Sequence, residues 1–228
     1  MSCIKNSNNE FVFQRQRDGS LNFVGNFDAL YRDQQNPWFQ SGESNTDWQK
    51  YYELSRNKIF NAIEENDISI LEVGCGAGYV VNFLNEALAK TNVSGLDISN
   101  EAIQIAKKNF PKLEFSIGDI ADNNLLLEKK YEVVILNQLL WYILKPLGQV
   151  IRNVHCTLEV SGRLLISQAF FKEYQEYGRD ILIGIDGLEA YMSAKHSELF
   201  ELEDIQYDQS EGLVHDDGLL IYRSLKTK

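Results

Sequence analysis

The chain has 228 residues, 44% of them apolar and 24% charged, which is enough to bury one substantial hydrophobic core. Its formal net charge is −11 and no run of Lys and Arg stands out, so the composition argues against a nucleic-acid partner. The chain starts with polar residues, and its most apolar stretch, VVILNQLLWYIL, is far shorter than the roughly 20 residues that span a bilayer, so we expect a soluble cytoplasmic protein without a membrane partner.

Residues 1–50 are rich in Asn, Gln and aromatic side chains but lack a sustained helical or strand period. We expect them to form an ordered cap or lid, because their aromatic side chains would be costly to leave in water. One domain is expected to follow over residues 51–228. A helical pattern begins at Asp47, where apolar side chains recur mostly on one face.

Strands and helices then alternate along the chain. Apolar runs predict seven strands: ISILEV, NVSGLDI, KLEFSI, YEVVILN, RLLISQAF, LFELEDIQYD and GLLIYRSL. Ser99 can cap the helix after the second strand, and Pro146 can begin a later helix that ends near Gly162. The pattern predicts an α/β fold, with a doubly wound and mostly parallel seven-stranded sheet, helices on both faces and an antiparallel hairpin at the C-terminal edge.

Three glycines, Gly74, Gly76 and Gly78, directly follow the first of these strands and precede a helix. A dinucleotide fingerprint needs its third glycine at position 79, which is Tyr79, and a P-loop needs a Gly-Lys-Ser/Thr that does not follow. The loop therefore indicates a backbone that approaches an adenosine without a diphosphate cradle. Cys75 could be a reactive thiol at a helix N-terminus, but a small side chain that fits a crowded turn is the favoured interpretation.

Three acids stand at the ends of consecutive predicted strands. Glu72 ends the first, where a carboxylate needs a cation or hydrogen-bond donors. Asp97 ends the second and could accept both hydroxyls of a ribose, and Asp119 closes the third and could accept an adenine amino group. Because ligands of such sheets bind at the carboxyl edge, the three acids indicate one site.

In this order and spacing, LEVGCGAG, GLDIS, GDI and YEVVILNQLLWYI resemble the motifs of class I S-adenosylmethionine-dependent methyltransferases, over residues 50–225. The resemblance implies a Rossmann-like methyltransferase fold with S-adenosylmethionine as cofactor. It also implies a cofactor-binding set of Glu72, Gly74, Gly76, Gly78, Asp97, Ile98, Asp119, Ile120 and Asn137. A methyl group would pass to a small-molecule acceptor by in-line displacement, which needs no metal.

A second resemblance lies ahead of the glycine loop. The segment NPWFQSGESNTDWQKYYELSRNKIFNAI is similar to the start of nodulation-type N-methyltransferases that act on chitooligosaccharides, although Asn36 stands where they have Asp. This likeness implies a small polar, sugar-like acceptor. It also implies that Arg56 pairs with the carboxylate of the cofactor.

Aromatic side chains are the candidates for the acceptor pocket: Trp38, Tyr51, Trp141, Tyr142, Phe171, Tyr174 and Tyr177. Packing in the core explains several of them equally well. Gln138 follows Asn137 in place of the Pro-Pro-aromatic run of enzymes that methylate amino groups of DNA bases or glutamine, which disfavours those acceptors. No histidine is singled out as a general base, because a lone histidine is more often a surface or core residue.

Two other functions stay open. One is a non-catalytic module that keeps the cofactor or its product while the acceptor pocket is filled. The other is a nicotinamide-dependent oxidoreductase on a similar sheet, which Tyr79 in the glycine loop disfavours. The sequence does not decide between an oxygen and a nitrogen acceptor atom.

Overall fold

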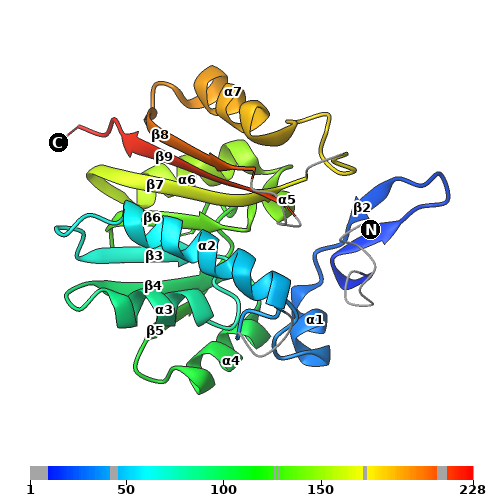
Figure 1. The fold of residues 1–228 in the computed structure, drawn as a ribbon, viewed down its shortest axis with the longest axis horizontal. Coiled ribbons are helices and arrows are strands. Elements are labelled where there is room, and N and C mark those ends of the chain that lie inside the picture. Colours follow the sequence, from blue (N-terminus) through cyan, green and yellow to red (C-terminus); the bar gives the residue numbers. More distant parts are fainter. Residues whose placement is uncertain are drawn as a thin grey trace.

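The computed structural model describes residues 10–41, 46–125, 127, 129–171, 174–209 and 215–227. Its main sheet has seven strands: β3 (Ser69–Val73), β4 (Asn92–Asp97), β5 (Glu114–Ile117), β6 (Tyr131–Asn137), β7 (Leu158–Phe170), β8 (Phe200–Asp208) and β9 (Asp216–Ser224). Their order is β5-β4-β3-β6-β7-β9-β8, and neighbours are parallel except that β9 is antiparallel to β7 and β8 (Figure 1). The predicted fold class is confirmed.

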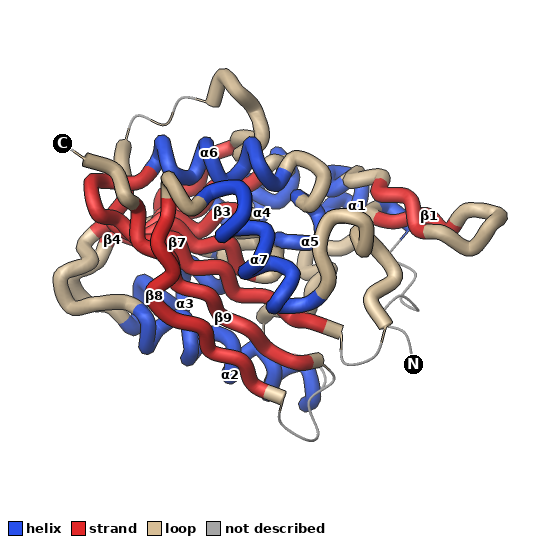
Figure 2. Tube along the Cα trace, turned by 90° about the horizontal axis from the view of Figure 1, so that it is seen from above, coloured by secondary structure: helices blue, strands red, loops and turns tan. Residues whose placement is uncertain are grey.

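Helices cover both faces of this sheet (Figure 2). One face packs against α2 (Thr46–Ala62), α3 (Tyr79–Ala87) and α4 (Asn100–Asn109), and the other against α5 (Leu140–Ile143), α6 (Leu147–Thr157) and α7 (Gly184–His196). Successive residues of β3 point to opposite faces of the sheet. Ile70 packs on the face covered by α2, α3 and α4, whereas Leu71 and Val73 pack on the face covered by α5, α6 and α7. Within the described part of the chain, no helix is both long and apolar enough to cross a membrane.

Two of the predicted helix ends can be compared with the structure. Ser99 is the N-cap of α4, and its Oγ accepts a hydrogen bond of 3.1 Å from a backbone N–H of the first turn, as predicted. The predicted helix end near Gly162 is wrong, because α6 ends at Thr157 and β7 begins at the next residue. The register between β6 and β7 shifts here and Ser161 has a positive φ of 57°, so the extra residues form an irregularity within the strand.

The N-terminal segment contains a hairpin and a helix that its sequence pattern does not reveal. The hairpin pairs β1 (Phe13–Arg15) with β2 (Leu21–Phe23), and α1 (Phe27–Asp33) follows. Asp28 Oδ1 joins α1 to the start of α4, because it accepts hydrogen bonds from Ser99 Oγ at 2.7 Å and from Glu101 N at 3.2 Å. The division between cap and domain at residue 50 would fall inside α2, and it stays a prediction.

Candidate active site

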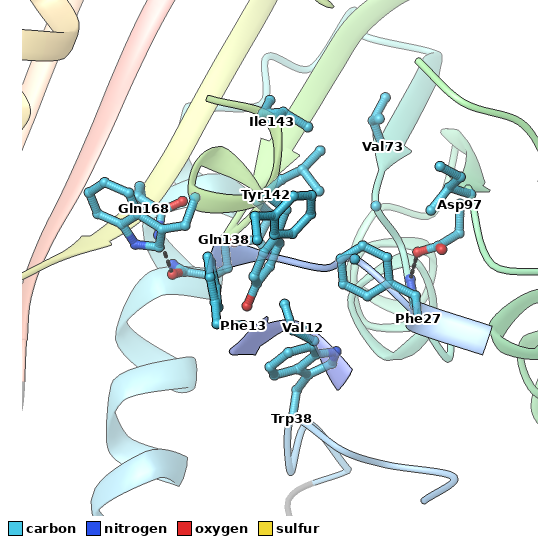
Figure 3. A pocket seen from close by; sticks show the side chains of 18 of the residues that line it. Val12, Phe13, Phe27, Trp38, Val73, Asp97, Gln138, Tyr142, Ile143 and Gln168 are labelled. Atoms are coloured by element: carbon cyan, nitrogen blue, oxygen red, sulfur yellow. Dashed lines mark hydrogen bonds between the residues drawn. The ribbon is translucent and has the colours of Figure 1, made fainter. Parts of the chain in front are cut away.

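A cavity of about 450 Å³ lies at the carboxyl ends of β3, β4, β6 and β7, beneath the N-terminal segment (Figure 3). Its volume is in the range of small-molecule sites. The sheet edge contributes Val73, Gly74, Gly76, Leu96, Asp97, Ile98, Gly118, Asp119, Ile120, Asn137 and Gln138 to the wall. Most of the residues that the sequence predicts to bind a cofactor therefore border one cavity.

The glycine loop forms one side of this cavity. Gly74 and Gly76 have positive φ angles of 74° and 54°, which residues with a side chain rarely adopt. A Cβ atom on Gly74 would lie 2.6 Å from Cδ1 of Leu139, and one on Gly76 would collide with the hydroxyl of Tyr31. Gly74 and Gly76 thus leave a recess in the cavity wall, which we call the glycine cradle, and a larger residue at either position would fill it.

Gly78 and Cys75 belong to the same loop but do not border the cavity. A Cβ atom on Gly78 would lie 2.7 Å from the ring of Phe115, so this glycine lets α3 pack closely on the sheet. Its predicted contact with the cofactor stays a prediction. Cys75 is buried, and burial raises the pKa of its thiol well above the ordinary value. Cys75 is therefore the small side chain of a crowded turn.

Asp97 stands at the end of β4 and borders the cavity with Ile98. Its Oδ2 accepts a hydrogen bond from Gly76 N (Figure 3) and its Oδ1 accepts one from Ser99 N, both at 2.8 Å. Burial raises the pKa of the carboxyl, while the two N–H groups favour its charged form. Each carboxylate oxygen has a second acceptor site, so Asp97 can also take hydrogen bonds from two hydroxyls of a ligand.

Asp119 and Ile120 follow β5 and border the cavity beside Asp97 along the sheet edge. Asp119 Oδ1 accepts a hydrogen bond of 2.8 Å from Ala121 N, which closes an Asx turn. Ile120 is buried in the core, where it gives the wall an apolar surface. An apolar surface beside a carboxylate suits an adenine ring with its amino group.

Glu72 is buried behind the glycine loop and does not itself border the cavity. Asn137, which does border it, donates a hydrogen bond of 3.4 Å from Nδ2 to Glu72 Oε1. Within the described residues, the buried atoms Glu72 Oε2 and Asn137 Oδ1 have no hydrogen-bond partner. Burial raises the pKa of Glu72 to about 8, against the smaller opposing effects of Asn137 and the Arg56 charge.

Glu72→Gln should remove a pH dependence of stability. Because the pKa is raised from 4.5 to about 8 on folding, the stabilising contribution of Glu72 is complete below pH 4.5 and is lost as the pH rises to about 8. The free energy of unfolding should fall by up to about 1.4 kcal/mol per pH unit across this window, and the variant should lose that slope. Urea denaturation measures both proteins, with the exposed Glu65→Gln as control. Equal slopes for the wild type and Glu72→Gln would contradict the assignment.

Arg56 lies on α2 behind the cavity wall. Its guanidinium donates a hydrogen bond of 2.8 Å to the carbonyl oxygen of Gln40 and lies 5.7 Å from the centre of the Tyr52 ring. Gln40 and Tyr52 border the cavity, whereas Arg56 does not. Arg56 therefore supports the wall, and its direct pairing with a cofactor carboxylate stays a prediction.

Aromatic side chains form the other half of the wall. Of the predicted acceptor residues, those that border the cavity are Trp38, Tyr51, Trp141, Tyr142, Phe171 and Tyr177. Tyr174 lies outside it, because its side chain is 62% exposed and its ring centre lies 4.3 Å from the guanidinium of Arg179. Its assignment to the acceptor pocket therefore has no support in the geometry.

Tyr142 lies at the centre of an aromatic cluster that closes the cavity (Figure 3). Its ring centroid is 5.5 Å from that of Phe27, 5.7 Å from Trp38 and 6.1 Å from Phe13, all three from the N-terminal segment. Tyr31 from the same segment accepts a hydrogen bond of 3.2 Å from Trp38 Nε1. The N-terminal segment thus supplies a wall of the cavity, as a lid would.

Gln138, Gln168 and His215 also border the cavity, although the sequence does not mark them as site residues. Gln138 has a positive φ of 55°, a strained conformation that the surrounding contacts must hold. Its Oε1 accepts a hydrogen bond of 2.9 Å from Ala169 N, and its Nε2 donates one of 2.7 Å to Tyr51 Oη. We call Tyr51, Gln138, Gln168 and His215 the polar corner. Only the position of Gln138, directly after β6, could have indicated its role.

A family model for a methyltransferase domain matches residues 64–209, which is more than half of the chain. The chain belongs to this methyltransferase family. The resemblance found in the sequence is confirmed, and the cofactor of the methyltransferase is S-adenosylmethionine. The glycine loop and the strand-end acids of the cavity lie within the matched part of the chain, whereas the N-terminal residues of its wall lie outside it.

Three known proteins show how far the similarity extends. The malonyl-[acyl-carrier protein] O-methyltransferase of Bacillus cereus is 36% identical over 115 residues, which are 50% of this chain and 42% of that protein. This chain thus spans less than half of that relative's length. The N-methyltransferase NodS from Bradyrhizobium japonicum WM9, in complex with S-adenosyl-l-homocysteine, shares the fold with a TM-score of 0.63 at 15% identity, over 84% of this chain and 93% of that one. The [4+2]-cyclase SpnF has a TM-score of 0.66 at 14% identity, over 87% and 95%. Because SpnF is named for another reaction, the fold alone does not decide the chemistry.

Proposed function

We propose that the protein transfers a methyl group from S-adenosylmethionine to an oxygen or nitrogen atom of a small-molecule acceptor. The observation that carries the proposal is one cavity with two different halves, the glycine cradle and strand-end acids on one side and the aromatic cluster and polar corner on the other. The cofactor supplies an activated methyl group. The protein has to align the two ligands and exclude water between them.

The residues of the sheet edge fit this cofactor. Gly74 and Gly76 leave the room that a close ligand needs, and Asp97 can accept the two ribose hydroxyls. Asp119 can accept the adenine amino group. The unsatisfied Oδ1 of buried Asn137 is available to an ammonium group at the methionine end.

Asp97→Ala should weaken cofactor binding by about 1.5 to 3 kcal/mol, or about 10- to 150-fold, through the loss of charge-assisted hydrogen bonds. It should also lower the free energy of unfolding by about 1 to 3 kcal/mol, because the N–H groups of Gly76 and Ser99 lose their acceptor. Isothermal titration with S-adenosylmethionine and urea denaturation measure the two effects. The control is Asp122→Ala, which removes another Asx-turn carboxylate, since Asp122 Oδ1 accepts from Asn124 N. Unchanged cofactor affinity in Asp97→Ala would reject the ribose assignment.

The aromatic half of the cavity favours an acceptor with a planar or otherwise apolar body and one reactive atom. A sugar-like acceptor could stack on these rings, but its many hydroxyls would need more partners than the polar corner offers. The named Bacillus cereus relative acts on a group carried by a protein. Here the N-terminal segment covers the cavity, which favours a free small molecule.

Two measurements test this function against its alternatives. Titration with S-adenosylmethionine, S-adenosylhomocysteine and NADH should show binding of the first two alone, and binding of NADH alone would instead support an oxidoreductase. Incubation of the full chain with methyl-labelled S-adenosylmethionine and a small-molecule extract should give a labelled product. Tight cofactor binding without any labelled product, across extracts of several sources, would support a non-catalytic binding module.

A further inference from the structure

The hydroxyl of Tyr31 lies at the glycine cradle. Tyr31 is on α1, its side chain is buried, and it borders the cavity together with Gly76 and Asp97. Its oxygen lies where a side chain on residue 76 would begin, so a glycine at that position makes room for it. Gly76 N also donates a hydrogen bond of 2.8 Å to Asp97 Oδ2. The hydroxyl of Tyr31 and the carboxylate of Asp97 therefore contact the same residue of the cavity wall.

The proton of this hydroxyl has no acceptor among the residues that the structure describes. Trp38 Nε1 forms a hydrogen bond of 3.2 Å with the Tyr31 oxygen, and an indole N–H can only donate. The Tyr31 oxygen thus accepts this bond, and its own O–H is left for another partner. Burial, followed by the charge of Asp97, raises the pKa of Tyr31 well above its ordinary value, so the hydroxyl keeps its proton. Since buried donors in proteins are nearly always paired, this one points to a ligand in the cavity.

We propose that Tyr31 donates a hydrogen bond to a ribose hydroxyl of S-adenosylmethionine, beside Asp97. A ribose hydroxyl that gives its proton to the Asp97 carboxylate still has lone pairs, and these need a donor once the site is closed to water. The carboxylate of the methionine part is a poorer partner for Tyr31, because it would bring a second anion close to Asp97. The inference rests on the proposed function, in which Asp97 holds the ribose.

The anchoring of α1 holds the hydroxyl at the cradle through contacts within the protein. Asp28, three residues before Tyr31 on the same helix, accepts hydrogen bonds from Ser99 Oγ at 2.7 Å and from Glu101 N at 3.2 Å. Trp38 then directs the Tyr31 O–H away from itself. A donor that is already in place costs the ligand little ordering. Because Tyr31 lies outside the matched residues 64–209, the motifs of the family could not have indicated it.

The first test compares the full-length wild type with Tyr31→Phe, which removes the hydroxyl and keeps the ring. The affinity for S-adenosylhomocysteine, measured by isothermal titration, should fall about 5- to 30-fold, because a ribose oxygen loses its donor in a closed site. Tyr222→Phe is the matched control. The Tyr222 side chain is also buried and its hydroxyl has no partner among the described residues, but it does not border the cavity. This control should bind S-adenosylhomocysteine as the wild type does.

The second test locates the oxygen that accepts the bond. Analogues of S-adenosylhomocysteine that lack the 2′ or the 3′ hydroxyl are titrated into the wild type and Tyr31→Phe. One analogue should show the same loss as S-adenosylhomocysteine, and the other should bind both proteins equally, because it lacks the accepting oxygen. 5′-Methylthioadenosine keeps the ribose without the amino-acid part, so Tyr31→Phe should weaken its binding as well. Where a deoxy analogue binds too weakly to measure, the 5′-methylthioadenosine comparison decides.

The outcomes separate this inference from the proposed function. A Tyr31→Phe affinity for S-adenosylhomocysteine within about twofold of the wild type overturns the Tyr31 assignment alone. An equal loss for S-adenosylhomocysteine and both deoxy analogues, or no loss for 5′-methylthioadenosine, overturns the ribose as its partner. A wild type that binds neither S-adenosylmethionine nor S-adenosylhomocysteine refutes the cofactor site itself.

Trp38→Phe keeps the test decisive if Tyr31→Phe does not fold. It leaves the Tyr31 hydroxyl in place but removes the N–H that directs it. The affinity for S-adenosylhomocysteine should fall about two- to fivefold, with no change for the deoxy analogue that lacks the accepting oxygen. Equal losses for all three ligands would contradict the hydrogen bond between Tyr31 and the ribose.

Discussion

Gly76→Val should reduce the affinity for S-adenosylmethionine by at least about 100-fold, or about 2.7 kcal/mol. Two effects combine at this position. The backbone has a positive φ of 54°, which a β-branched residue adopts only under strain, and the new side chain would collide with the hydroxyl of Tyr31. The valine would thus fill the cradle in which the ligand is expected to lie. Isothermal titration measures the affinity and urea denaturation the remaining stability.

Gly19→Val is a matched control for Gly76→Val. Gly19 also has a positive φ, of 85°, but no atom lies within 4 Å of the place where its Cβ would be. This variant should lose about 1 to 2 kcal/mol of stability from backbone strain and keep its cofactor affinity. If Gly76→Val binds the cofactor as well as Gly19→Val does, the glycine loop is not the cofactor site.

Deletion of residues 1–45 should leave a protein that unfolds cooperatively but transfers no methyl group. The sheet and the helices on its two faces form their core from α2 onward, whereas the N-terminal segment mainly covers the cavity. Loss of Tyr31, Trp38 and the hairpin exposes the cofactor to water, so its affinity should fall by about 10- to 100-fold. Thermal unfolding followed by circular dichroism, cofactor titration and the labelling assay measure the three properties.

Arg15→Ala is a milder change in the same segment and serves as the control. It breaks an exposed ion pair of 2.9 Å with Glu176, and pairs of this kind contribute at most about 1 kcal/mol. Stability and affinity should stay near the wild-type values. An unfolded deletion variant would show that the aromatic side chains of the segment belong to the main core, and a fully active one would show that the segment is no lid.

The sequence predicted the part of the site that consecutive strands bring together. Asp97 and Asp119 end neighbouring parallel strands, so their common edge follows from the alternation of strands and helices alone. Sequence patterns did not predict site residues that come from strands far apart in the chain. His215, directly before β9, reaches the cavity only because β9 runs antiparallel beside β7.

The N-terminal hairpin was missed for a related reason. Its strands are three residues each, too short for an alternating pattern, and the Phe13 ring is held by Tyr142 and Tyr177, which are far away in the sequence. The acceptor residues show the same limit. Tyr174 and Tyr177 lie in one irregular segment, and only the folded chain places the second at the cavity and the first in solvent. A pattern of residues over a short stretch of sequence cannot distinguish the buried tyrosine from the exposed one.

Ser99 couples the sheet edge of the site to helix α1 of the N-terminal segment. Its backbone N–H donates to Asp97, the expected ribose acid, and its hydroxyl donates to Asp28 on α1. A ligand that changes the position of Asp97 therefore also changes how firmly α1 is held, and this coupling is reciprocal because both are equilibria of one molecule. Occupation of the ribose site should slow amide hydrogen exchange in α1, and loosening of α1 should weaken occupation by the same factor.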